Sequence, residues 1–452
     1  MSKSITIFWF RRDLRLEDNA GFYRALKNEK NVLPLFIFDR EILDKLENKK
    51  DTRVEFIYDE ITRLHAELKE EGSTILVRYG TPEKIWKKLL KEYTIESVYT
   101  NHDYEPYAKK RDAAIEAILS KKNIPFKTYK DHVIFEKDEV VKKDGDPYVV
   151  FTPYSKVWKA KLKSRMVKNT ADTLSEKISY YFKPYPNRKY FKHLLQTKPE
   201  EIITLQEMGF ERTDQSIPDR SVSKKLVKHY DETRNFPAIN GTTQLSIHFR
   251  FGTISIRDKA LKGKRLNETF LSELIWRDFY AMILDHFPHV ADGPFREKYT
   301  QIEWRNNEKE FKAWCEGQTG YPIVDAGMRQ LNQSGYMHNR VRMITASFLT
   351  KHLLVDWQWG EAYFAEKLLD YDLASNNGGW QWAAGTGTDA APYFRIFNPY
   401  TQATKFDKQE EYIKEWVPEF GTEEYPEPIV DHKEARERCL RVYKEGLAKA
   451  ER

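Results

Sequence analysis

The chain has 452 residues, with 75 Lys and Arg against 69 Asp and Glu, and a formal net charge of +6 at pH 7. This length exceeds what one hydrophobic core usually supports, so we expect two or three domains. Two cysteines far apart, Cys315 and Cys439, argue against a disulfide framework and favour a reducing, cytoplasmic location. The pattern of a signal peptide is missing and no segment is long and apolar enough to cross a membrane, so no membrane partner is expected.

Four short apolar runs near the start are rich in β-forming residues: ITIFWF, VLPLFIF, TILVRY and SVYT. Helical patterns separate them or follow them at 53–71, 82–93 and 108–122. This alternation predicts a Rossmann-like α/β domain over residues 1–130, with a doubly wound parallel sheet covered by helices on both faces. The segment FRRDLRLEDN lacks a G-x-G-x-x-G motif, so a dinucleotide at the usual first turn is not expected.

Residues 131–220 are rich in Lys, Tyr and Pro, with a predicted hairpin turn at KKDGDPY and a loop at KPYPNRKYF. We interpret them as an interdomain connector. Residues 221–452 predict an all-α domain, with amphipathic helices over 268–285, 324–334, 340–354 and 361–369. Eight of the eleven tryptophans occur from Trp276 onward, so we expect the chemistry to lie in this domain.

The stretch from Asp370 to Pro399, DYDLASNNGGWQWAAGTGTDAAPYFRIFNP, combines acids, amides, glycines and two tryptophans without hydrophobic periodicity. We predict a loop that lines a cavity for a large planar ligand. The alternative is a buried turn with core tryptophans.

Three hydroxyl side chains, Thr242, Thr243 and Ser246, occur where a helix is expected to begin. Hydroxyls, backbone N–H groups and the helix dipole could together bind a pyrophosphate there. Ordinary helix capping is an equal alternative for this short run.

A predicted helix carries Glu273, Trp276, Arg277 and Tyr280 at helical spacing, so a carboxylate, a guanidinium and aromatic rings lie on neighbouring faces. A solvated Glu and Arg face is the alternative. The tryptophan favours a nucleic-acid surface, because extruded or single-stranded bases stack on aromatic rings.

A second predicted helix begins with Asn339, Arg340 and Arg342, which add an amide and two phosphate-seeking groups. By contrast, His286 and His289 in HFPH have no third ligand nearby, so no metal site is expected.

Several long motifs resemble the photolyase/cryptochrome family, and within it the class I cyclobutane pyrimidine dimer photolyases: GTTQLS, LIWRDFY, TGYPIVDAGMRQLNQSGYMHNRVRMITASFL and NNGGWQWAAGTGTDAAPYFRIFNP. The resemblance extends from FWFRRDLRLEDN to IVDHKEARER. It implies an α/β antenna domain and a helical domain that binds FAD, active in its reduced form. The implied reaction is light-driven electron transfer to a pyrimidine dimer flipped out of damaged DNA, by a monomer without an obligate protein partner.

The resemblance also implies roles for single residues. The positions at the flavin are Tyr230, Thr242, Thr243, Gln244, Leu245, Ser246, Arg277, Asn339, Arg342, Asp370, Tyr371, Asp372 and Asn376. The positions at DNA or the lesion are Arg234, Glu273, Trp276, Arg277, Tyr280, Asn339, Arg340, Met343, Trp382 and Arg395. Glu273, Asn339 and Asn376 take part in catalysis, and Trp380, Trp357 and Trp304 form an electron path to the flavin.

A second, antenna chromophore is also implied. Folate-binding members carry an Asn-Glu pair where this chain has Tyr107 and Ala108, whereas Asp103, Glu105 and Arg250 match a deazaflavin- or flavin-type antenna better.

Three other functions compete with dimer repair. A cryptochrome-type blue-light photosensor is the main alternative. The (6-4) photolyases carry paired histidines where this chain has Met337, His338 and Asn339. A flavin oxidoreductase would not require two tryptophans and several arginines in one pocket.

Overall fold

The computed structural model describes residues 4–168 and 177–451. The chain forms two compact units, which we call the α/β unit and the helical unit. The α/β unit comprises Met1–Glu136, Lys159–Ser221 and Gln244–Lys262, and the helical unit comprises Lys137–Trp158, Val222–Thr243 and Gly263–Arg452. Residues 131–220, which the sequence suggested as a connector, therefore contribute to both units.

The α/β unit is built on a five-stranded sheet with the order β3-β2-β1-β4-β5, in which every neighbouring pair is parallel. Its strands are β1 (Ile5–Phe10), β2 (Val32–Asp39), β3 (Leu76–Gly80), β4 (Ile95–Asn101) and β5 (Phe126–Tyr129). The predicted doubly wound parallel sheet is confirmed, and β5 is an addition to it. The strand order reverses direction between β1 and β4, which is where such sheets usually bind ligands.

Helices surround this sheet, and two short strands form a separate hairpin. The helices are α1 (Ala20–Asn28), α2 (Arg40–Leu43), α3 (Thr52–Glu70), α4 (Pro82–Glu92), α5 (Pro106–Ser120) and α9 (Ser246–Phe251), with 3-10 turns η2 (Tyr180–Phe182), η3 (Asn187–His193) and η4 (Gln206–Met208). The hairpin pairs β6 (Met166–Lys168) with β7 (Lys177–Ser179). Helix α10 (Ile256–Leu266) begins in the α/β unit and ends in the helical unit.

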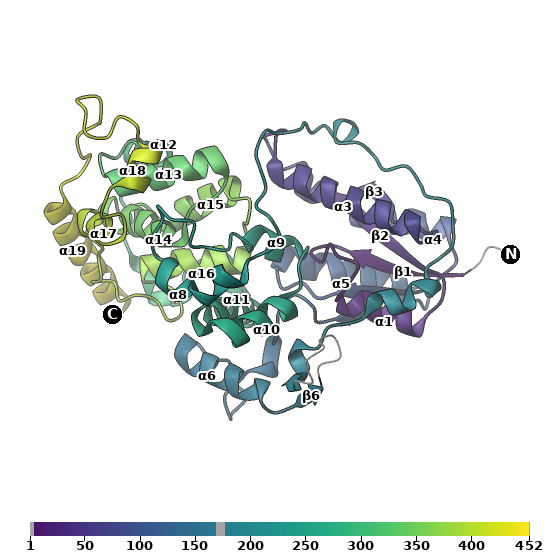
Figure 1. Cartoon of the computed structure of the whole chain (residues 1–452). Helices are drawn as coiled ribbons and strands as arrows, with labels where there is room; N and C mark the ends of the chain where they lie inside the picture. The colour runs from purple at the N-terminus through teal and green to yellow at the C-terminus, as the bar shows by residue number, and fades with distance from the viewer. Residues whose placement is uncertain (1–3, 169–176, 452) are drawn as a thin grey trace. The chain divides into compact units, whose positions relative to one another are not determined.

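Strand β1 is buried on both faces, which explains its continuous apolar sequence. Figure 1 shows this strand within the sheet, among the helices of the α/β unit. Phe8 and Phe10 contact Phe22 of α1, with ring centroids 5.0 and 5.3 Å apart. Trp9 points to the opposite face and meets Trp86 of α4 at 5.6 Å. Because successive side chains of a strand alternate, one strand anchors helices on both sides of the sheet.

The helical unit contains the following elements in chain order: η1 (Lys137–Glu139), α6 (Phe151–Leu162, through Trp158), α7 (Lys224–Lys228), α8 (Tyr230–Thr233), α11 (Glu268–His286), η5 (Pro288–Ala291), η6 (Glu297–Gln301), α12 (Glu308–Glu316), α13 (Pro322–Ser334), α14 (Asn339–Ser347), the π-helical turn η7 (Phe348–His352), α15 (Trp357–Lys367), α16 (Leu373–Ala384), α17 (Pro399–Phe406), α18 (Glu411–Trp416) and α19 (His432–Ala450). The predicted all-α architecture is confirmed.

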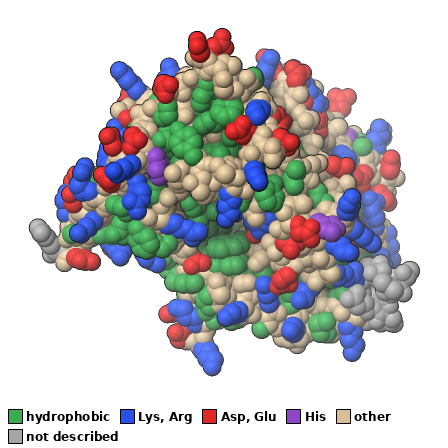
Figure 2. Space-filling model, turned by 60° about the vertical axis from the view of Figure 1, so that its left-hand side comes forward, with side chains coloured by type: hydrophobic (Ala, Val, Ile, Leu, Met, Phe, Trp, Pro, Cys, Tyr) green, Lys and Arg blue, Asp and Glu red, His purple; other side chains and the backbone are tan. Residues whose placement is uncertain are grey.

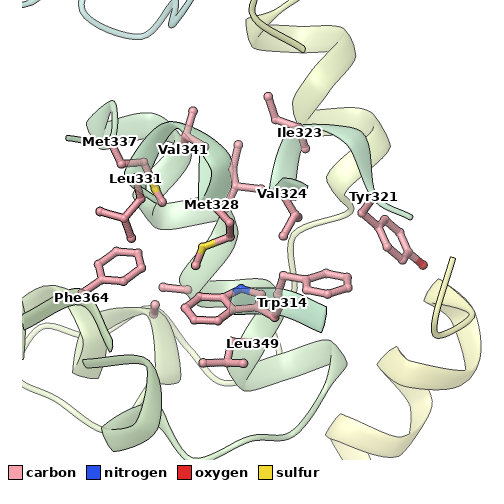
Figure 3. Close-up of a cluster of buried hydrophobic side chains, with 14 of the residues drawn as sticks. Trp314, Tyr321, Ile323, Val324, Met328, Leu331, Met337, Val341, Leu349 and Phe364 are labelled. Atoms are coloured by element: carbon pink, nitrogen blue, oxygen red, sulfur yellow. The ribbon is translucent and has the colours of Figure 1, made fainter. Parts of the chain in front are cut away.

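The largest part of the helical core gathers around Trp314 of α12 (Figure 3). Its indole N–H donates to the Thr345 carbonyl oxygen at 3.1 Å, so the polar atom of this buried ring is satisfied. Met328 and Leu331 of α13 and Val341 of α14 belong to the same cluster. This core holds α12 to α16 together.

The prediction of a loop over residues 370–399 was wrong for its first half, which forms helix α16. Asp372 caps the helix by accepting from the Ser375 N–H at 3.1 Å, and Gly385 ends it at φ +81°. A Cβ at Gly378 would lie 2.2 Å from the Tyr280 ring, so glycine permits the close approach of α11. Hydrophobic periodicity is missing because polar contacts, described below, hold much of this helix.

Candidate functional site

Helix α11 presents Glu273, Trp276 and Tyr280 together, as the spacing predicted. Glu273 Oε1 accepts a hydrogen bond from Arg234 Nη1. The rings of Trp276 and Tyr280 lie 5.4 Å apart at an interplanar angle of 32°. Burial raises the pKa of Tyr280, helped by the nearby charges of Asp389 and Glu273, so its phenol stays protonated near neutral pH.

The segment before α9 brings further predicted residues to the same helices. Burial raises the pKa of Tyr230, with a further contribution from Glu273. The guanidinium carbon of Arg234 lies 5.5 Å from the centre of the Tyr230 ring. Thr242 Oγ1 and the Tyr336 hydroxyl are 3.3 Å apart. Tyr230, Arg234, Thr242 and Glu273 are therefore brought together, from distant parts of the sequence.

Helix α14 begins at Asn339, as predicted, and His338 caps it by accepting from the Arg340 N–H at 3.1 Å. Arg342 Nη2 donates to Asp370 Oδ2 at 2.9 Å, and its Nε donates to the Met337 carbonyl oxygen at 2.7 Å. The structure thus joins Arg342 and Asp370 in an ion pair that the sequence did not predict. This pair fixes the start of the 370–399 stretch against α14.

Positive charge accumulates around Arg340. Burial lowers the pKa of Arg340, and the charges of Arg234 and Arg395 lower it further. We call Arg234, Arg340 and Arg395 the arginine cluster. Arg340 Nη2 donates to Asn235 Oδ1 at 2.7 Å, while its buried Nε has no hydrogen-bond partner among the described residues. Such a donor is ready for an anionic ligand.

His338 is buried and also responds to the positive charges around Arg340. Burial lowers the pKa of His338 to about 4, with further lowering by Arg342, Arg340 and Arg234. The imidazole is therefore uncharged at neutral pH. A local potential that opposes a further proton favours a phosphate.

Exposed apolar side chains adjoin the arginine cluster in sequence. Phe394, which precedes Arg395, is 61% exposed, and Phe236 and Ile239 follow Arg234 closely. Figure 2 shows hydrophobic side chains exposed among Lys and Arg on one side of the molecule. Guanidinium groups suit phosphates and exposed rings suit bases, so this combination is typical of a nucleic-acid surface.

One face of α16 fits a flat ligand with a polar edge. Asn376 and Gly379 are one turn apart on that face, and a Cβ built on Gly379 meets none of the described side chains within 4 Å. A mid-helix glycine costs about 1 kcal/mol relative to alanine, so open space beside it indicates a use. Asn376 Nδ2 donates to the Glu361 carbonyl oxygen at 3.2 Å, which leaves its own Oδ1 to accept. These residues fit the ring system of a flavin.

A polar network behind this face was missed from the sequence. Asn377 Nδ2 donates to the Val290 carbonyl oxygen at 2.8 Å and to Glu361 Oε1 at 3.1 Å. Gln381 Nε2 donates to Asn377 Oδ1 at 3.0 Å. Burial raises the pKa of Glu361 to about 7. The network orders α16 against α15 and places a titrating carboxyl behind Asn376.

The tryptophans of the predicted electron path differ in exposure. Trp380 and Trp357 are each 2% exposed and belong to the main core, and Trp304 packs against it while partly exposed. A Cβ at Gly360 would lie 2.1 Å from the Trp380 ring, so α15 and α16 meet closely there. Trp382 also packs against this core.

The remaining predicted residues occupy the following places. Arg277 follows Trp276 on α11, Tyr371 and Asp372 precede α16, and Met343 Sδ accepts from Arg340 Nη1 at 3.7 Å. Thr243 belongs to the helical unit, whereas Gln244, Leu245 and Ser246 belong to the α/β unit. Helix α9 begins at Ser246, as the sequence predicted.

The α/β unit has a charged crevice at the reversal of strand order. It is small and open to solvent, and it is lined by Arg11, Arg12, Asp13, Asn101, His102, Asp103, Asp131 and His132. Arg12 Nη1 donates to Asp103 Oδ1 at 3.1 Å and to Glu105 Oε1 at 2.9 Å. Burial alone would raise the pKa of Asp103, but Arg12 and neighbouring arginines lower it to about 2. The charges of this crevice therefore neutralise each other.

Among the described residues, no group of three or more His, Cys, Asp or Glu side chains is placed to hold a metal ion. Nε2 of His286 lies 3.4 Å from Oδ1 of Asp138. Within 4–168 and 177–451, none of the helices has the length and apolar character needed to span a bilayer.

Three residues with contacts to the site escaped the sequence analysis: Phe151, Glu361 and Asp389. Phe151 lies in the stretch that we interpreted as a connector, although the following Thr-Pro pair is a usual sign of a helix start. Burial of Glu361 and the contact of Asp389 with α6 depend on tertiary structure, so periodicity gave no signal for them.

An α/β unit followed by a tryptophan-rich helical unit, with an amide and an open glycine on one face of α16, defines the class of fold that photolyases and cryptochromes share. Residues 6–174 match the family described as DNA photolyase, and residues 270–422 match the FAD binding domain of DNA photolyase. The chain belongs to the DNA photolyase family, and its helical unit contains the FAD-binding domain.

Known relatives resemble the chain over nearly its whole length. It is 37% identical to a deoxyribodipyrimidine photo-lyase of Alkalihalophilus pseudofirmus over 98% of both chains. An archaeal photolyase from Sulfolobus tokodaii, solved with two FAD molecules, matches with 34% identity and a TM-score of 0.80, covering 98% of this chain and 100% of that one. A Synechocystis cryptochrome at 24% identity and a TM-score of 0.81, covering 98% and 99%, shares the fold.

Proposed function

We propose that this protein repairs cyclobutane pyrimidine dimers in DNA by a light-dependent reaction. One observation carries the proposal: the helical unit has an open face on α16 for a planar cofactor, aromatic rings on α11, and Arg340 of the arginine cluster at the start of α14. The first feature suits FAD and the other two suit an extruded pyrimidine dimer with its phosphates. Relatives named deoxyribodipyrimidine photo-lyase support the choice of lesion.

For the cofactor, we assign Asn376 Oδ1 as an acceptor at the edge of the flavin ring. The open space beside Gly379 would receive the ring itself. When bound and fully reduced, FAD supplies on excitation by light the electron that opens the cyclobutane ring and that returns once both carbon–carbon bonds are broken. The Arg342–Asp370 pair holds the start of α16 in place. We propose that the other positions implied by the family resemblance also contact the flavin.

For the substrate, we propose that Trp276, Glu273 and Trp382 bind the flipped dimer. Trp276 offers a ring for stacking, and Glu273, held by Arg234, offers a carboxylate for the N–H groups of a pyrimidine. The arginine cluster binds the phosphates. Photolyases are a known class of base-flipping enzymes, and flipping costs roughly a few kcal/mol, less for a lesion that already stacks poorly.

We also propose that an electron passes along a path from Trp304 through Trp357 to Trp380. The order of exposure supports it, since Trp380 is buried in the core and Trp304 is partly exposed. Its role is to reduce oxidised flavin with an electron from outside.

We also propose a second chromophore in the α/β unit, of the deazaflavin or flavin type rather than folate. A structural relative solved with two FAD molecules supports a second ligand, and the reversal of strand order is where such sheets usually bind one. Tyr107, which replaces the first residue of the folate-type pair, donates its hydroxyl to Asp39.

We also propose a cytoplasmic location, which the free thiols of Cys315 and Cys439 support.

The decisive experiment incubates the purified, reduced protein with DNA that contains thymine dimers, in blue light and in the dark. We expect dimers to disappear only in light. A blue-light photosensor would leave the dimers equally intact in both conditions, and that result would reject the proposal. A parallel sample containing (6-4) photoproducts identifies the lesion, because we expect that lesion to persist.

A further inference from the structure

Phe151, the first residue of α6, covers one face of Trp276. The two ring centroids are 3.7 Å apart and the planes differ by 4°. Aromatic pairs usually have centroids about 4.5–7 Å apart in offset or edge-on arrangements, so this pair overlaps almost fully. No other ring can stack on that face of Trp276 while Phe151 is there.

The position of Phe151 is determined by the contacts of α6 with α11. Trp158 Nε1 donates to Asp278 Oδ2 at 2.9 Å, and both residues are fully buried. Tyr154, also buried, lies with its ring 5.2 Å from that of Phe279. These two contacts lie on successive turns of α6, so the helix cannot slide or rotate without breaking them.

Asp389 adds a third constraint at the beginning of α6. Its Oδ2 accepts a hydrogen bond from the Phe151 N–H at 3.1 Å. A carboxylate at a helix N-terminus accepts hydrogen bonds from the free N–H groups and interacts favourably with the helix dipole. Asp389 adopts φ +47°, a left-handed conformation that Asp tolerates better than most residues.

The same carboxylate also acts on Tyr280. Burial is the main cause of the raised pKa of Tyr280, and the charge of Asp389 raises it further. Asp389 therefore contacts Phe151, and its charge acts on Tyr280, one turn beyond Trp276. The segment between α16 and α17, which contains Arg395 of the arginine cluster, is tied through Asp389 to the Phe151–Trp276 stack.

We infer that Phe151 and Asp389 are positioning residues that fix the plane of Trp276 for a pyrimidine dimer. Phe151 closes one face of the indole, so the dimer meets the other face; Asp389 fixes Phe151. The inference rests on the proposed repair function. A partly exposed tryptophan without this support would sample several ring orientations, and ordering it on binding would cost affinity.

Intact DNA keeps its bases stacked in the duplex and does not bring them to Trp276. Loss of Phe151 therefore weakens binding of dimer-containing DNA and spares binding of intact DNA. A change in general stability would not produce this selectivity, so the ratio of the two affinities separates a positioning role from a structural one.

The test compares Phe151→Ala, Phe151→Tyr, Trp276→Ala and the Phe151/Trp276 double alanine variant in the full chain. Their dissociation constants are measured for one duplex with and without a thymine dimer. We expect Phe151→Ala to weaken dimer binding about tenfold, because the dimer then has to order an indole that is no longer fixed. Phe151→Tyr keeps the ring and restores the affinity. The double variant binds as Trp276→Ala does, because the two residues act as a unit.

The matched control is Phe311→Ala. Phe311 is a partly buried phenylalanine of the same unit that stacks on Trp314, at 5.9 Å and 18°. We expect this variant to leave the affinity ratio unchanged. The inference is overturned if Phe151→Ala tightens dimer binding, which would mean that the phenylalanine occupies the place of the base. Equal losses on both DNAs, or the same change in the control, would also overturn it.

A DNA-free measurement separates this inference from the proposed function. In protein labelled with 5-fluorotryptophan, the fluorine signal that Trp276→Ala removes should shift or broaden in Phe151→Ala and not in Phe311→Ala. An unchanged signal refutes the positioning role even if the protein repairs dimers. If the parent protein shows no preference for dimer-containing DNA, the proposed function fails and the inference falls with it.

Discussion

The buried ion pairs of the α/β unit and the arginine cluster of the helical unit treat charge in opposite ways. In the α/β unit, Arg257 donates to Asp18 and Asp131 at 2.8 Å, and Arg15 donates to Asp131 at 2.6 Å, so each buried charge has an opposite partner. In the helical unit, the arginine cluster retains an excess of positive charge. Internal neutralisation is typical of charges that hold a fold together, whereas excess charge in a partly buried place is typical of a site that awaits a ligand.

The largest expected effect comes from breaking the neutralised network. Arg257→Met should lower the free energy of unfolding by about 3–5 kcal/mol, because Asp18 and Asp131 would remain buried without this cation. Urea denaturation of the full chain measures the loss. Arg212, which pairs with Glu55 and Asp59 from an exposed position, provides the control, and Arg212→Met should cost at most about 1 kcal/mol. Equal losses would mean that burial does not distinguish these pairs.

A smaller effect concerns Glu361, whose partner in the helical unit is an amide rather than a cation. Burial raises its pKa to about 7, so the folded state keeps a proton that the unfolded state releases near pH 4.5. The stabilising contribution of the neutral acid is complete below the unfolded pKa and is lost as pH rises through the folded pKa.

Glu361→Gln should therefore become more stable relative to the parent as pH rises. Between about pH 5 and about pH 8 we expect the difference in unfolding free energy to shift by about 2–3 kcal/mol in favour of the glutamine variant. Urea denaturation of both proteins across this range gives the difference directly. A difference that does not change with pH would show that Glu361 is ionised throughout.

Much of the architecture could be predicted from the sequence because it depends on local patterns. Alternating apolar runs and amphipathic segments identified the parallel sheet and the helices, and helical spacing placed Trp276 and Tyr280 together. Strand β5, with the short sequence FKTY, is too brief for a periodic signal. Helix α16 was missed because amide hydrogen bonds and a glycine contact, rather than an apolar stripe, hold it in place.

The parts of the site that escaped prediction depend on contacts between distant segments. Arg342 and Asp370 could each be selected as candidates, but their ion pair follows only from the way α14 meets the segment before α16. Phe151 precedes Trp276 by more than a hundred residues, and no sequence period connects them. The excess of positive charge at Arg340 likewise depends on the approach of Arg234 and Arg395.

The salt dependence of damaged-DNA binding tests the contrast between the two units most directly. The parent, Arg340→Gln and Arg12→Gln are compared by plotting the logarithm of affinity against the logarithm of salt concentration. Each phosphate contact contributes about −0.9 to the slope. We predict that Arg340→Gln makes the slope shallower by about 0.9, while Arg12→Gln, whose charge is neutralised by Asp103 and Glu105, leaves it unchanged. A slope that changes for Arg12→Gln and not for Arg340→Gln would contradict the account.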